Sequence, residues 1–403
     1  MSNRWLGAII SKTPPTITAP VDGEGGSASG AWSTASQANY QALGTWPKPV
    51  IAGQLWSWGD NSSGRLGLGN TTSYSSPKQV GALTTWRNIS GGSFQFNIAT
   101  QTNGTLWSWG RGADGRLGLG NTTNYSSPKQ VGALTAWLKI AAGYEYTLAT
   151  KTDGTLWSWG FNSSGQLGLG NTTRYSSPTQ IGLLTTWSNI TSKRASARAT
   201  KTDGTLWIWG SNNHGQLGLG NITNYSSPKQ VGALTTWLTI SGGYNHTVAT
   251  KTDGTLWTWG GNANGGLGLS NTTSYSSPKQ VGALTTWLSI AGGFYSTVAT
   301  KTDGTLWTWG QNTYGQLGLG NTTHYSSPKQ VGALTTWSKI SIGDYQTIAL
   351  KTDGTLWVWG NGDSGQLGLG NTTRYSSPKQ LGVLTTWLKI ATGYNQTMAL
   401  KTP

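Results

Sequence analysis

The sequence predicts an all-β protein: a seven-bladed β-propeller of four-stranded blades, closed by its two chain ends (2+2 closure) and preceded by an extended N-terminal arm. Three observations support this fold class. One phrase recurs seven times, each copy holds four strand-like segments, and the array begins and ends at different points of the phrase. Repeats of this length bury their apolar faces by stacking on their neighbours, as propeller blades do.

Tryptophan marks the repeat most clearly. Each copy reads Gly-Thr-Leu-Trp-x-Trp-Gly, then Gly-Gln-Leu-Gly-Leu-Gly-Asn-Thr-Thr, then Tyr-Ser-Ser-Pro, with small variations. The second tryptophan recurs every 50 residues, except for a first interval of 51: Trp58, Trp109, Trp159, Trp209, Trp259, Trp309 and Trp359. The 403 residues include 60 Gly and 24 Trp with only 10% charged residues, a composition typical of short strands and tight turns.

Each copy predicts four strands, and the second full copy serves as the example. Its expected strands are A over 137–141, B over 147–151, C over 155–159 and D near 178–181. Asp153-Gly154 between strands B and C is a strong signal for a tight hairpin turn. Strand C is continuously apolar, as in a strand buried on both faces, with Trp157 and Trp159 on one side and Leu156 on the other.

The array starts at strand C and stops after strand B. Its first copy begins at residues 54–58 and its last ends at 397–402. We therefore expect one blade to take strands A and B from the C-terminal end, and strands C and D from residues 53–81. Pairing the two ends would remove an open sheet edge, which is a hazard for aggregation.

Residues 1–48 lie outside the repeat and are expected to form the arm, whereas residues 49–403 form the propeller. The arm contains a Pro/Thr stretch, a Gly/Ser-rich stretch and a weak helix signal, and it has too little apolar material to fold alone. We expect it to dock on a partner through its apolar residues: Trp5, Ile9, Ile10 and Trp32.

Enzyme chemistry finds little support in the sequence. The glycines of Gly165-x-x-Gly168-x-Gly170 are not in phosphate-loop or dinucleotide order, and their recurrence around the ring marks a turn scaffold. His214 and His246 fall in loops of neighbouring blades, but no Cys or local acid supplies the other ligands that zinc needs. We predict no catalytic residue, no cofactor and no metal, and cysteine is absent altogether.

Two further sequence features bear on targeting. The Asn-Thr-Thr triplets are formal glycosylation acceptors, but we interpret them as turn residues whose side chains satisfy loop backbone groups. The apolar run after Arg4 is shorter than a signal-peptide core, and no segment approaches the ~20 apolar residues of a membrane-spanning helix. We therefore expect no signal peptide and no membrane insertion.

The copies differ mainly at three places, and these predict the binding surface. They vary after the second Trp-Gly, as at Arg111, after Asn-Thr-Thr, as at Arg174 and Arg374, and after strand A, as at Asp344. In an up-and-down blade, the A–B and C–D loops emerge on one side and the B–C turns on the other. The variable positions therefore collect on one face of the disc, opposite nearly uniform Lys-Thr-Asp-Gly turns.

Aromatic residues are concentrated at the variable positions. Aromatics mixed with Asn, Ser and Gly are the chemistry of adaptable recognition surfaces. Neutral drift is the alternative, because packing does not constrain such loops, but drift would not favour aromatics. We predict that the variable face binds a ligand through Phe94, Phe96, Tyr144, Tyr146, Phe161, Lys193, Arg194, Tyr244, His246, Phe294, Tyr295, Tyr314, Tyr345 and Tyr394. The tryptophans, shared by every copy, are expected in the core.

The net charge of +15 raises nucleic acid or an anionic surface as a partner. Most lysines, however, recur at identical places in the repeat, such as Lys78, Lys129, Lys151 and Lys201. A basic residue repeated around a ring is typical of a solvated charge that protects a sheet edge. Nucleic acid is therefore not the expected partner, and steeply salt-dependent retention on DNA would be the contrary sign.

Three motifs resemble a known family. They are the run from Asp253 to Gly260, the Gly-Gln-Leu-Gly-Leu-Gly of Gly315 to Gly320, and Gly243-Tyr-Asn-His-Thr247. Over residues 50–403 the chain resembles the regulator-of-chromosome-condensation repeat family of seven-bladed propellers, whereas kelch repeats lack the Gly-Gln-Leu-Gly element. Members of that family act in nucleotide exchange, ultraviolet sensing or inhibition of bacterial enzymes, and the fold does not choose among these roles.

The arm adds a second resemblance. Residues 1–15 and 27–32 look like the N-terminal stretch of some tailed-phage virion proteins. We therefore predict a non-enzymatic structural protein at the virion surface, a tail or capsid-surface component. Its arm would dock on other virion proteins, and its variable face would bind a host-surface protein or glycan, or another virion subunit. The alternative is a soluble protein-binding propeller that inhibits or scaffolds a partner through the same face; a third interpretation, DNA binding, rests on charge alone.

Overall fold

The computed structural model describes residues 17–18, 27–28 and 51–403. Backbone contacts divide the chain into two compact units, Met1–Ile51 and Ala52–Pro403. In the first unit, strand β1 (Ile17–Thr18) pairs antiparallel with β2 (Ser27–Ala28). The residues predicted to dock the arm lie outside the described residues: Trp5, Ile9, Ile10 and Trp32.

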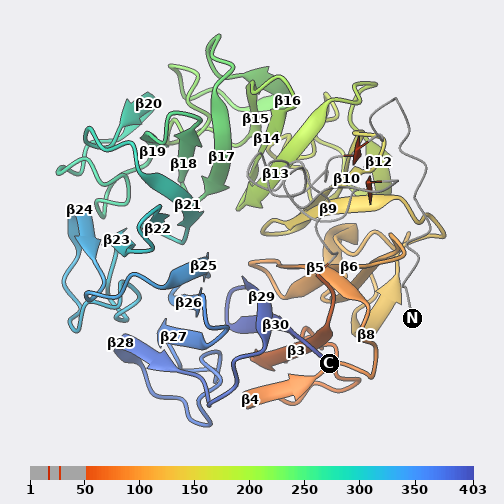
Figure 1. The fold of residues 1–403 in the computed structure, drawn as a ribbon. Helices are drawn as coiled ribbons and strands as arrows, with labels where there is room; N and C mark the ends of the chain where they lie inside the picture. The colour runs from red at the N-terminus through yellow and green to blue at the C-terminus, as the bar shows by residue number, and fades with distance from the viewer. Residues whose placement is uncertain (1–16, 19–26, 29–50) are drawn as a thin grey trace, which may run out of the picture. The chain divides into compact units, whose positions relative to one another are not determined.

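The second unit is a ring of seven four-stranded antiparallel sheets, which confirms the predicted propeller (Figure 1). We number the sheets as blades 1 to 7 in the chain order of their innermost strands, and call the strands A to D from the channel outward. Blade 2 consists of β9 (Trp137–Ala142), β10 (Tyr146–Lys151), β11 (Leu156–Gly160) and β12 (Tyr175–Gln180). Only its strand D differs clearly from expectation: it begins earlier, because Tyr175 pairs with Gly160 beyond a register shift.

The other blades repeat this pattern with closely similar bounds. Blade 1 contains β5 (Trp86–Gly91), β6 (Phe96–Gln101), β7 (Leu106–Gly110), the 3-10 turn η1 (Ala113–Gly115) and β8 (Tyr125–Gln130). Blade 3 contains β13 (Trp187–Lys193), β14 (Ser196–Lys201), β15 (Leu206–Gly210) and β16 (Tyr225–Gln230). Blade 4 contains β17 (Trp237–Gly242), β18 (His246–Lys251), β19 (Leu256–Gly260) and β20 (Tyr275–Gln280). Blade 5 contains β21 (Trp287–Gly292), β22 (Ser296–Lys301), β23 (Leu306–Gly310) and β24 (Tyr325–Gln330). Blade 6 contains β25 (Trp337–Ile342), β26 (Gln346–Lys351), β27 (Leu356–Gly360) and β28 (Tyr375–Gln380).

Blade 7 is completed by both ends of the propeller sequence. Its strand order is β29 (Trp387–Thr392), β30 (Gln396–Lys401), β3 (Gln54–Gly59) and β4 (Tyr74–Gln79). Strands β30 and β3 pair continuously from Gln54↔Lys401 to Gly59↔Gln396. The predicted 2+2 closure is therefore confirmed, and no blade is left with half a sheet.

The core lies between neighbouring blades and is built from the second tryptophan of each repeat. Trp159 is fully buried against blade 1, where its indole Nε1 donates to the carbonyl of Arg116 at 3.1 Å. Leu156 packs on the other side, against Trp187 and Trp209 of blade 3. These opposite orientations confirm the prediction for strand C, and burying each such side chain stabilises the ring by ~2–3 kcal/mol.

The first tryptophan of each repeat corrects two expectations. Trp157 is only half-buried, so not every shared tryptophan is a core residue. The ammonium of Lys151 lies 3.6 Å from the centre of the Trp157 ring, and Lys151 is only 8% exposed, so this repeated lysine is not a solvated charge. Lys129 on the outermost strand β8 is exposed, as the edge-protection interpretation requires.

Glycine positions bring the C–D loop of one blade onto the next. Gly168 has φ of 73°, and a Cβ there would lie 2.6 Å from Trp209 Nε1. Only glycine tolerates both the left-handed backbone and this approach. The Gly-Gln-Leu-Gly-Leu-Gly segment is therefore a packing device of the scaffold.

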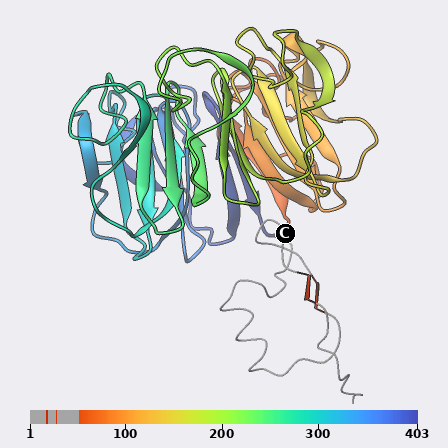
Figure 2. The same ribbon diagram turned by 90° about the horizontal axis from the view of Figure 1, so that it is seen from above.

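Figure 2 shows the ring of blades from the side, with the strands running between its two faces. The strand order places the A–B and C–D loops on one side, which we call the loop face, and the B–C turns and D–A connections on the other, the turn face. At the turn face, Asp153 Oδ1 accepts hydrogen bonds from the backbone N–H of Thr155 at 2.9 Å and its hydroxyl at 2.7 Å. In the C–D loop, Asn171 Oδ1 accepts from the backbone N–H of Thr173 at 3.0 Å, which confirms its turn role.

Candidate functional site

The A–B loops of the seven blades meet around one mouth of the central channel, on the loop face. Strand A is innermost in each sheet, so its end delivers the following loop to the channel. The channel encloses a cavity of about 260 Å³, whose lining includes Ser192, Ser241, Ser341 and Ile140 from strands A. Side chains from seven distant repeats therefore converge at this mouth.

Six aromatic rings from blades 4 to 7 form a connected cluster there. The ring centroids of Tyr244 and Phe294 are 4.0 Å apart, and those of Phe294 and Tyr345 are 5.2 Å apart. Three more rings join this chain, namely Tyr295 (4.4 Å from Phe294), Tyr314 (4.8 Å from Tyr345) and Tyr394 (6.5 Å from Tyr345). Burial and then the neighbouring carboxylate of Asp344 raise the pKa of Tyr345 to about 12, so its hydroxyl keeps its proton at neutral pH.

A second aromatic pair continues the cluster on blades 1 and 2. The ring centroids of Phe94 and Tyr144 are 4.8 Å apart. Both rings are half-buried, as are most of the cluster, so each presents an edge or part of a face to solvent. We call the combined set the aromatic arc: Phe94, Tyr144, Tyr244, Phe294, Tyr295, Tyr314, Tyr345 and Tyr394. These predicted residues are the ones that the structure brings together.

Arg194 joins the two parts of the aromatic arc. Its guanidinium lies 3.8 Å from the centre of the Tyr244 ring and donates a hydrogen bond to Asn245 Oδ1 at 2.8 Å. Its carbonyl accepts a hydrogen bond from the backbone N–H of Tyr144 at 3.3 Å. The Arg194 side chain is thus held against the Tyr244 ring, where arginine adds cation–π attraction to hydrogen bonding.

Three other arginines stack on aromatic rings of the loop face. Arg111 lies 4.7 Å from the centre of the Phe94 ring. Arg174 lies over Phe161 and Arg374 over Tyr314, each also at 4.7 Å. Phe161 is therefore placed on the loop face as predicted, but it pairs with arginine and makes no ring contact with the aromatic arc among those described.

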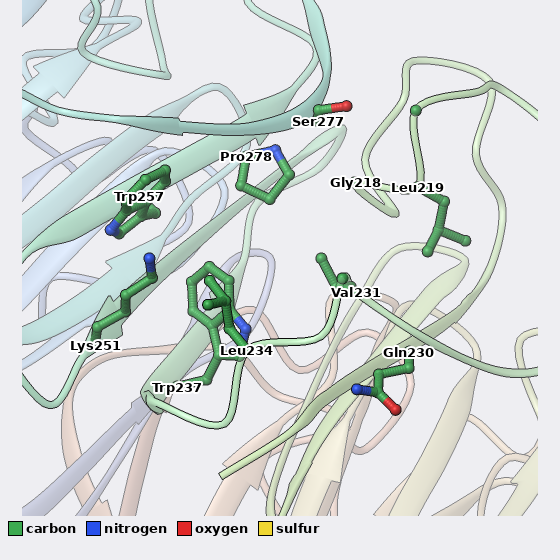
Figure 3. A pocket seen from close by; sticks show the side chains of 12 residues that line it. Gly218, Leu219, Gln230, Val231, Leu234, Trp237, Lys251, Trp257, Ser277 and Pro278 are labelled. Atoms are coloured by element: carbon green, nitrogen blue, oxygen red, sulfur yellow. The ribbon is translucent and has the colours of Figure 1, made fainter.

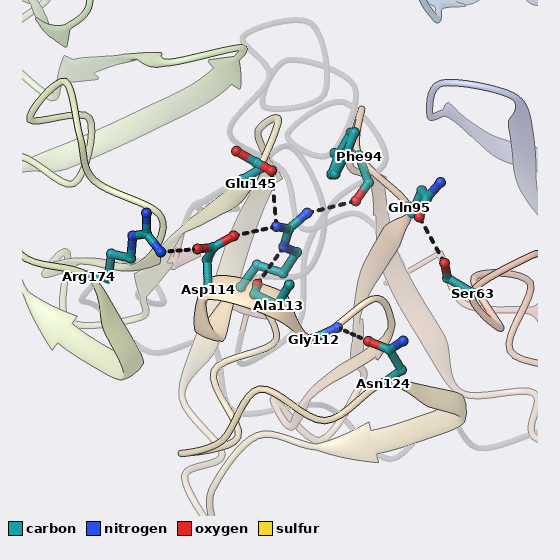
Figure 4. A network of polar contacts seen from close by, with 10 residues as sticks. Ser63, Phe94, Gln95, Gly112, Ala113, Asp114, Asn124, Glu145 and Arg174 are labelled. Atoms are coloured by element: carbon teal, nitrogen blue, oxygen red, sulfur yellow. Dashed lines mark hydrogen bonds and ion pairs between the residues drawn. The ribbon is translucent and has the colours of Figure 1, made fainter.

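Ion pairs fix the loops of blades 1 and 2 (Figure 4). The guanidinium of Arg116 is fully buried and contacts carboxylate oxygens of Asp114 at 2.9 Å and Glu145 at 3.2 Å. It also donates to the carbonyl of Phe94 at 3.0 Å, and Asp114 contacts Arg174 at 2.6 Å. Burial lowers the pKa of Arg116 even though both carboxylates oppose the shift.

A buried ion pair crosses the channel mouth. Lys193 Nζ of blade 3 lies 3.2 Å from Asp344 Oδ1 of blade 6, and the two blades stand on opposite sides of the ring (Figure 1). Burial raises the pKa of Asp344, an effect that Lys193 opposes. Lys193 is only 9% exposed, so the prediction that it presents its side chain on the face is wrong. It replaces a glycine that the other blades carry at this place: Gly92, Gly143, Gly243, Gly293, Gly343 and Gly393.

Three other predicted binding residues are buried, and their assignment to the exposed face is wrong. Phe96, Tyr146 and His246 begin strands B and are at most 1% exposed. The Tyr146 hydroxyl donates to the carbonyl of Ser196 at 2.6 Å, and His246 Nε2 lies within hydrogen-bond distance of Thr297 Oγ1, at 3.1 Å. These side chains vary between repeats because each must fit the neighbouring blade.

Arg198 is a buried cation that the sequence reasoning missed. Its guanidinium donates to Thr247 Oγ1 at 2.7 Å and to the carbonyls of Ser196 and His246, both at 3.2 Å. Burial lowers the pKa of Arg198 to about 10. Burial, Arg198 and Lys193 together lower the pKa of His246 to about 3. The sequence could have revealed Arg198, because it is the one charged residue at this place in the repeat. The equivalent positions of the other copies are apolar: Ile98, Leu148, Val248, Val298, Ile348 and Met398.

The periphery of the ring carries a repeated apolar groove between neighbouring blades. Between blades 3 and 4 it has a volume of about 400 Å³, and Figure 3 shows Leu234, Trp237 and Trp257 among its lining with Lys251 beside them. Grooves of about 410 and 340 Å³ occupy the equivalent junctions of blades 2 and 3 and of blades 6 and 7. Because shared residues build them, these grooves belong to the scaffold.

Two other features are absent from the part of the chain that the structure describes. No group of three or more His, Cys, Asp and Glu side chains there could hold a metal ion. No helix there is long and apolar enough to span a membrane.

Fold and repeat together define a class: a seven-bladed propeller made from tryptophan- and glycine-rich repeats. The model of the RCC1-like domain matches residues 191–402, and that of the regulator of chromosome condensation (RCC1) repeat matches residues 52–95, 103–150 and 153–194. The chain therefore belongs to the RCC1-like family. The family resemblance drawn from the sequence motifs is confirmed.

Similar proteins of known structure support the same fold. Human WBSCR16 superimposes with a TM-score of 0.79 at 19% identity, covering 87% of this chain and 99% of that one. Yeast RCC1 (Prp20), solved bound to Kap60, gives a TM-score of 0.78 at 18% identity, covering 88% and 90%. These identities establish the shared fold alone.

Curated relatives match over short segments. E3 ubiquitin-protein ligase HERC2 of Homo sapiens is 37% identical over 95 residues, which are 23% of this chain and 2% of that protein. Ultraviolet-B receptor UVR8 of Arabidopsis thaliana is 34% identical over 83 residues, 20% of this chain and 19% of that protein. Matches this short do not show that this protein shares the activity of either relative.

Proposed function

We propose that this propeller is a non-enzymatic protein-binding module that recognises its partner through the aromatic arc on the loop face. The observation that carries the proposal is the convergence of eight aromatic rings and stacked arginines from seven repeats at one channel mouth. Rigid aromatics with ordered arginines are the composition of interaction hot spots. Related propellers offer a precedent: Prp20p from Saccharomyces cerevisiae was characterised for binding to Gsp1p and histones.

We further propose that the protein is a virion component, displayed at the particle surface and anchored by its N-terminal arm. This part of the proposal rests on the resemblance of residues 1–15 and 27–32 to phage virion proteins and on the apolar arm residues Trp5, Ile9, Ile10 and Trp32. The ligand of the loop face would then be a host-surface protein or glycan, or another virion subunit. The alternative is a soluble inhibitor or scaffold that uses the same loop face.

Binding through the aromatic arc is tested with two matched double variants of the full chain. Tyr244→Ala/Phe294→Ala removes two stacked rings of the arc, whereas Leu184→Ala/Leu234→Ala removes two exposed leucines of the turn face, 49% and 47% exposed. Immobilised proteins are incubated with envelope and lysate proteins of the source and its host, and retained proteins are identified by mass spectrometry. A protein retained by the wild type and the leucine variant, but not by the aromatic variant, supports the proposal. Equal retention by all three would show that the arc is not the binding surface.

Virion location needs a separate experiment. Antibody against the propeller is applied to intact particles from the source and viewed by electron microscopy. Label on particle surfaces supports the virion role, and its loss when residues 1–48 are deleted supports docking by the arm. Unlabelled particles together with one soluble partner would replace the virion role by the inhibitor or scaffold role.

A further inference from the structure

The loop face carries more positive than negative side chains. The described residues place five carboxylates on this face, and each contacts a cation of the same chain: Asp60 with Arg65, Asp114 with Arg116 and Arg174, Glu145 with Arg116, Asp344 with Lys193, and Asp363 with Arg374. Eight cationic side chains lie on or directly beneath the same face, an excess of three: Arg65, Arg111, Arg116, Arg174, Lys193, Arg194, Arg198 and Arg374. The loop face therefore has no carboxylate left to offer a partner.

Two arginines of the surface account for most of that excess. Among the described residues, no carboxylate lies within ion-pair distance of Arg111 or Arg194. Both are half-buried, and their guanidinium groups lie over the rings of Phe94 and Tyr244 respectively. The third unpaired cation, Arg198, is buried beneath them and adds positive potential without being reachable.

The backbone conformation of Arg194 supports a functional role for its side chain. Lys193 pairs directly with Ser196, so the A–B connection of blade 3 is a two-residue turn of Arg194 and Ala195. Arg194 takes φ of 44°, a left-handed conformation that favours glycine. A non-glycine residue in this region carries a conformational cost, which is consistent with a use for its side chain.

We propose that the loop face binds an acidic segment of a protein partner, with the guanidinium groups of Arg111 and Arg194 as its carboxylate receptors. This inference rests on the proposed function and specifies the chemistry of its partner. Arg111 lies over Phe94 and Arg194 over Tyr244, so the segment presents its carboxylates beside the aromatic rings of the arc. Planar guanidinium groups fixed by stacking are suited to bidentate carboxylate recognition.

Single-stranded nucleic acid is the competing ligand for arginine and aromatic side chains. Base stacking needs open ring faces, whereas the rings of this arc are half covered by one another, in tilted or edge-to-face contacts at centroid distances of 4.0 to 6.5 Å. The structure therefore favours a peptide, and a nucleotide strand becomes an outcome of the test.

The test selects peptides for the loop face and asks what they contain. Randomised dodecapeptides in messenger-RNA display are selected on the full chain and counter-selected on Tyr244→Ala/Phe294→Ala. Affinities of the enriched peptides are then measured for the wild type, Arg111→Gln, Arg194→Gly and the control Lys129→Gln, which removes one exposed charge from outer strand β8. Arg194→Gly suits the left-handed backbone, so it removes the guanidinium without straining the turn.

We expect enrichment of Asp and Glu, affinities ~10-fold weaker for each arginine variant, and values for Lys129→Gln within ~2-fold of the wild type. Arg194→Lys, which keeps the charge but lacks the planar fork, should also bind more weakly than the wild type. If the enriched peptides lack Asp and Glu, or bind the arginine variants as tightly as the wild type, the proposal of an acidic partner is wrong. Binding through the aromatic arc would still stand. An absence of any arc-dependent peptide would overturn both proposals, and displacement of the peptides by oligo-dT would replace the protein partner by nucleic acid.

Discussion

The loop face and the turn face are made by the same seven repeats, yet the loop face differs far more from one repeat to the next than the turn face does. The turn face repeats one Asp–Thr hydrogen-bond pattern and a ring of leucines that are 44–50% exposed: Leu83, Leu134, Leu184, Leu234, Leu284, Leu334 and Leu384. The equivalent A–B position of the loop face is instead Tyr144, Arg194, Tyr244, Phe294, Asp344 or Tyr394. Stability therefore comes from groups that the repeats share, whereas most of the exposed differences between repeats lie in loops that the shared core holds in place.

The largest effect is expected from breaking the core on which both faces depend. Trp209 is fully buried and its Nε1 donates to the carbonyl of Gln166 at 3.0 Å. Trp209→Ala should lower the free energy of unfolding by ~3–5 kcal/mol, measured by chemical denaturation. Trp207→Ala, at the half-buried position two residues earlier, serves as the control and should cost clearly less. Equal costs would contradict the assignment of the core to the second tryptophan.

A smaller loss is expected when blade 3 is given the residue of the other blades at the channel mouth. Lys193→Gly leaves the buried carboxylate of Asp344 without its cation, at a cost of ~3 kcal/mol near neutral pH. The pKa of Asp344 is raised in the folded protein, so its carboxyl favours folding below the unfolded pKa and loses that benefit as pH rises through the folded pKa. The deficit of Lys193→Gly should therefore shrink on acidification, and Lys193→Gly/Asp344→Asn should recover stability. A double variant as unstable as the single one would argue against this pair.

An intermediate effect on stability is expected from His246, a variable residue that is buried. The pKa of His246 is about 3 in the folded state, against ~6.5 for an unperturbed histidine. The stability that neutral His246 contributes is present above that unfolded value and is lost as pH falls toward the folded one. Between pH 6.5 and 4.5 the loss should reach ~2–3 kcal/mol. His246→Gln, which installs the residue of Gln346 and Gln396, should remove this component of the urea midpoint's pH dependence; an unchanged slope would contradict it.

The smallest effect is expected on the uniform periphery. Lys151→Met removes the ammonium that lies 3.6 Å from the centre of the Trp157 ring, a contact worth ~0.5–1 kcal/mol. Lys129→Met on outer strand β8 should change stability by less. Both should leave peptide binding at the loop face unchanged, since neither touches the aromatic arc. Thermal unfolding of the two variants, measured in parallel, checks the stability effects. A larger loss of stability for Lys129→Met than for Lys151→Met would contradict the assignment of the stabilising contact to Lys151 and Trp157.

Periodicity was enough to predict the ring, its four-stranded blades and the closure by both chain ends, because these follow from repeated packing units. The site was harder, since a position can vary to suit either a ligand or the next blade. Tyr144 and Tyr146 show the ambiguity: both are variable tyrosines two residues apart, but one lies in the arc and the other bonds Ser196 of blade 3. Likewise, the pairing of Lys193 with Asp344 depends on which blades face each other across the channel, and no local pattern reports that.

The closure of blade 7 also has a mechanical consequence. Gln54 pairs with Lys401 at one end of the β3–β30 ladder, and Gly59 with Gln396 at the other. Force applied between residues 53 and 402 would thus act first on the Gln54↔Lys401 pair. The hydrogen-bonded pairs between β3 and β30 would then break one after another. Force between residue 53 and a ligand on the loop face would instead run along strand β3, where the pairs resist sliding together. The pairing of β3 with β30 is thus weak when the two ends of the propeller sequence are pulled apart, and strong when a bound partner pulls against residue 53.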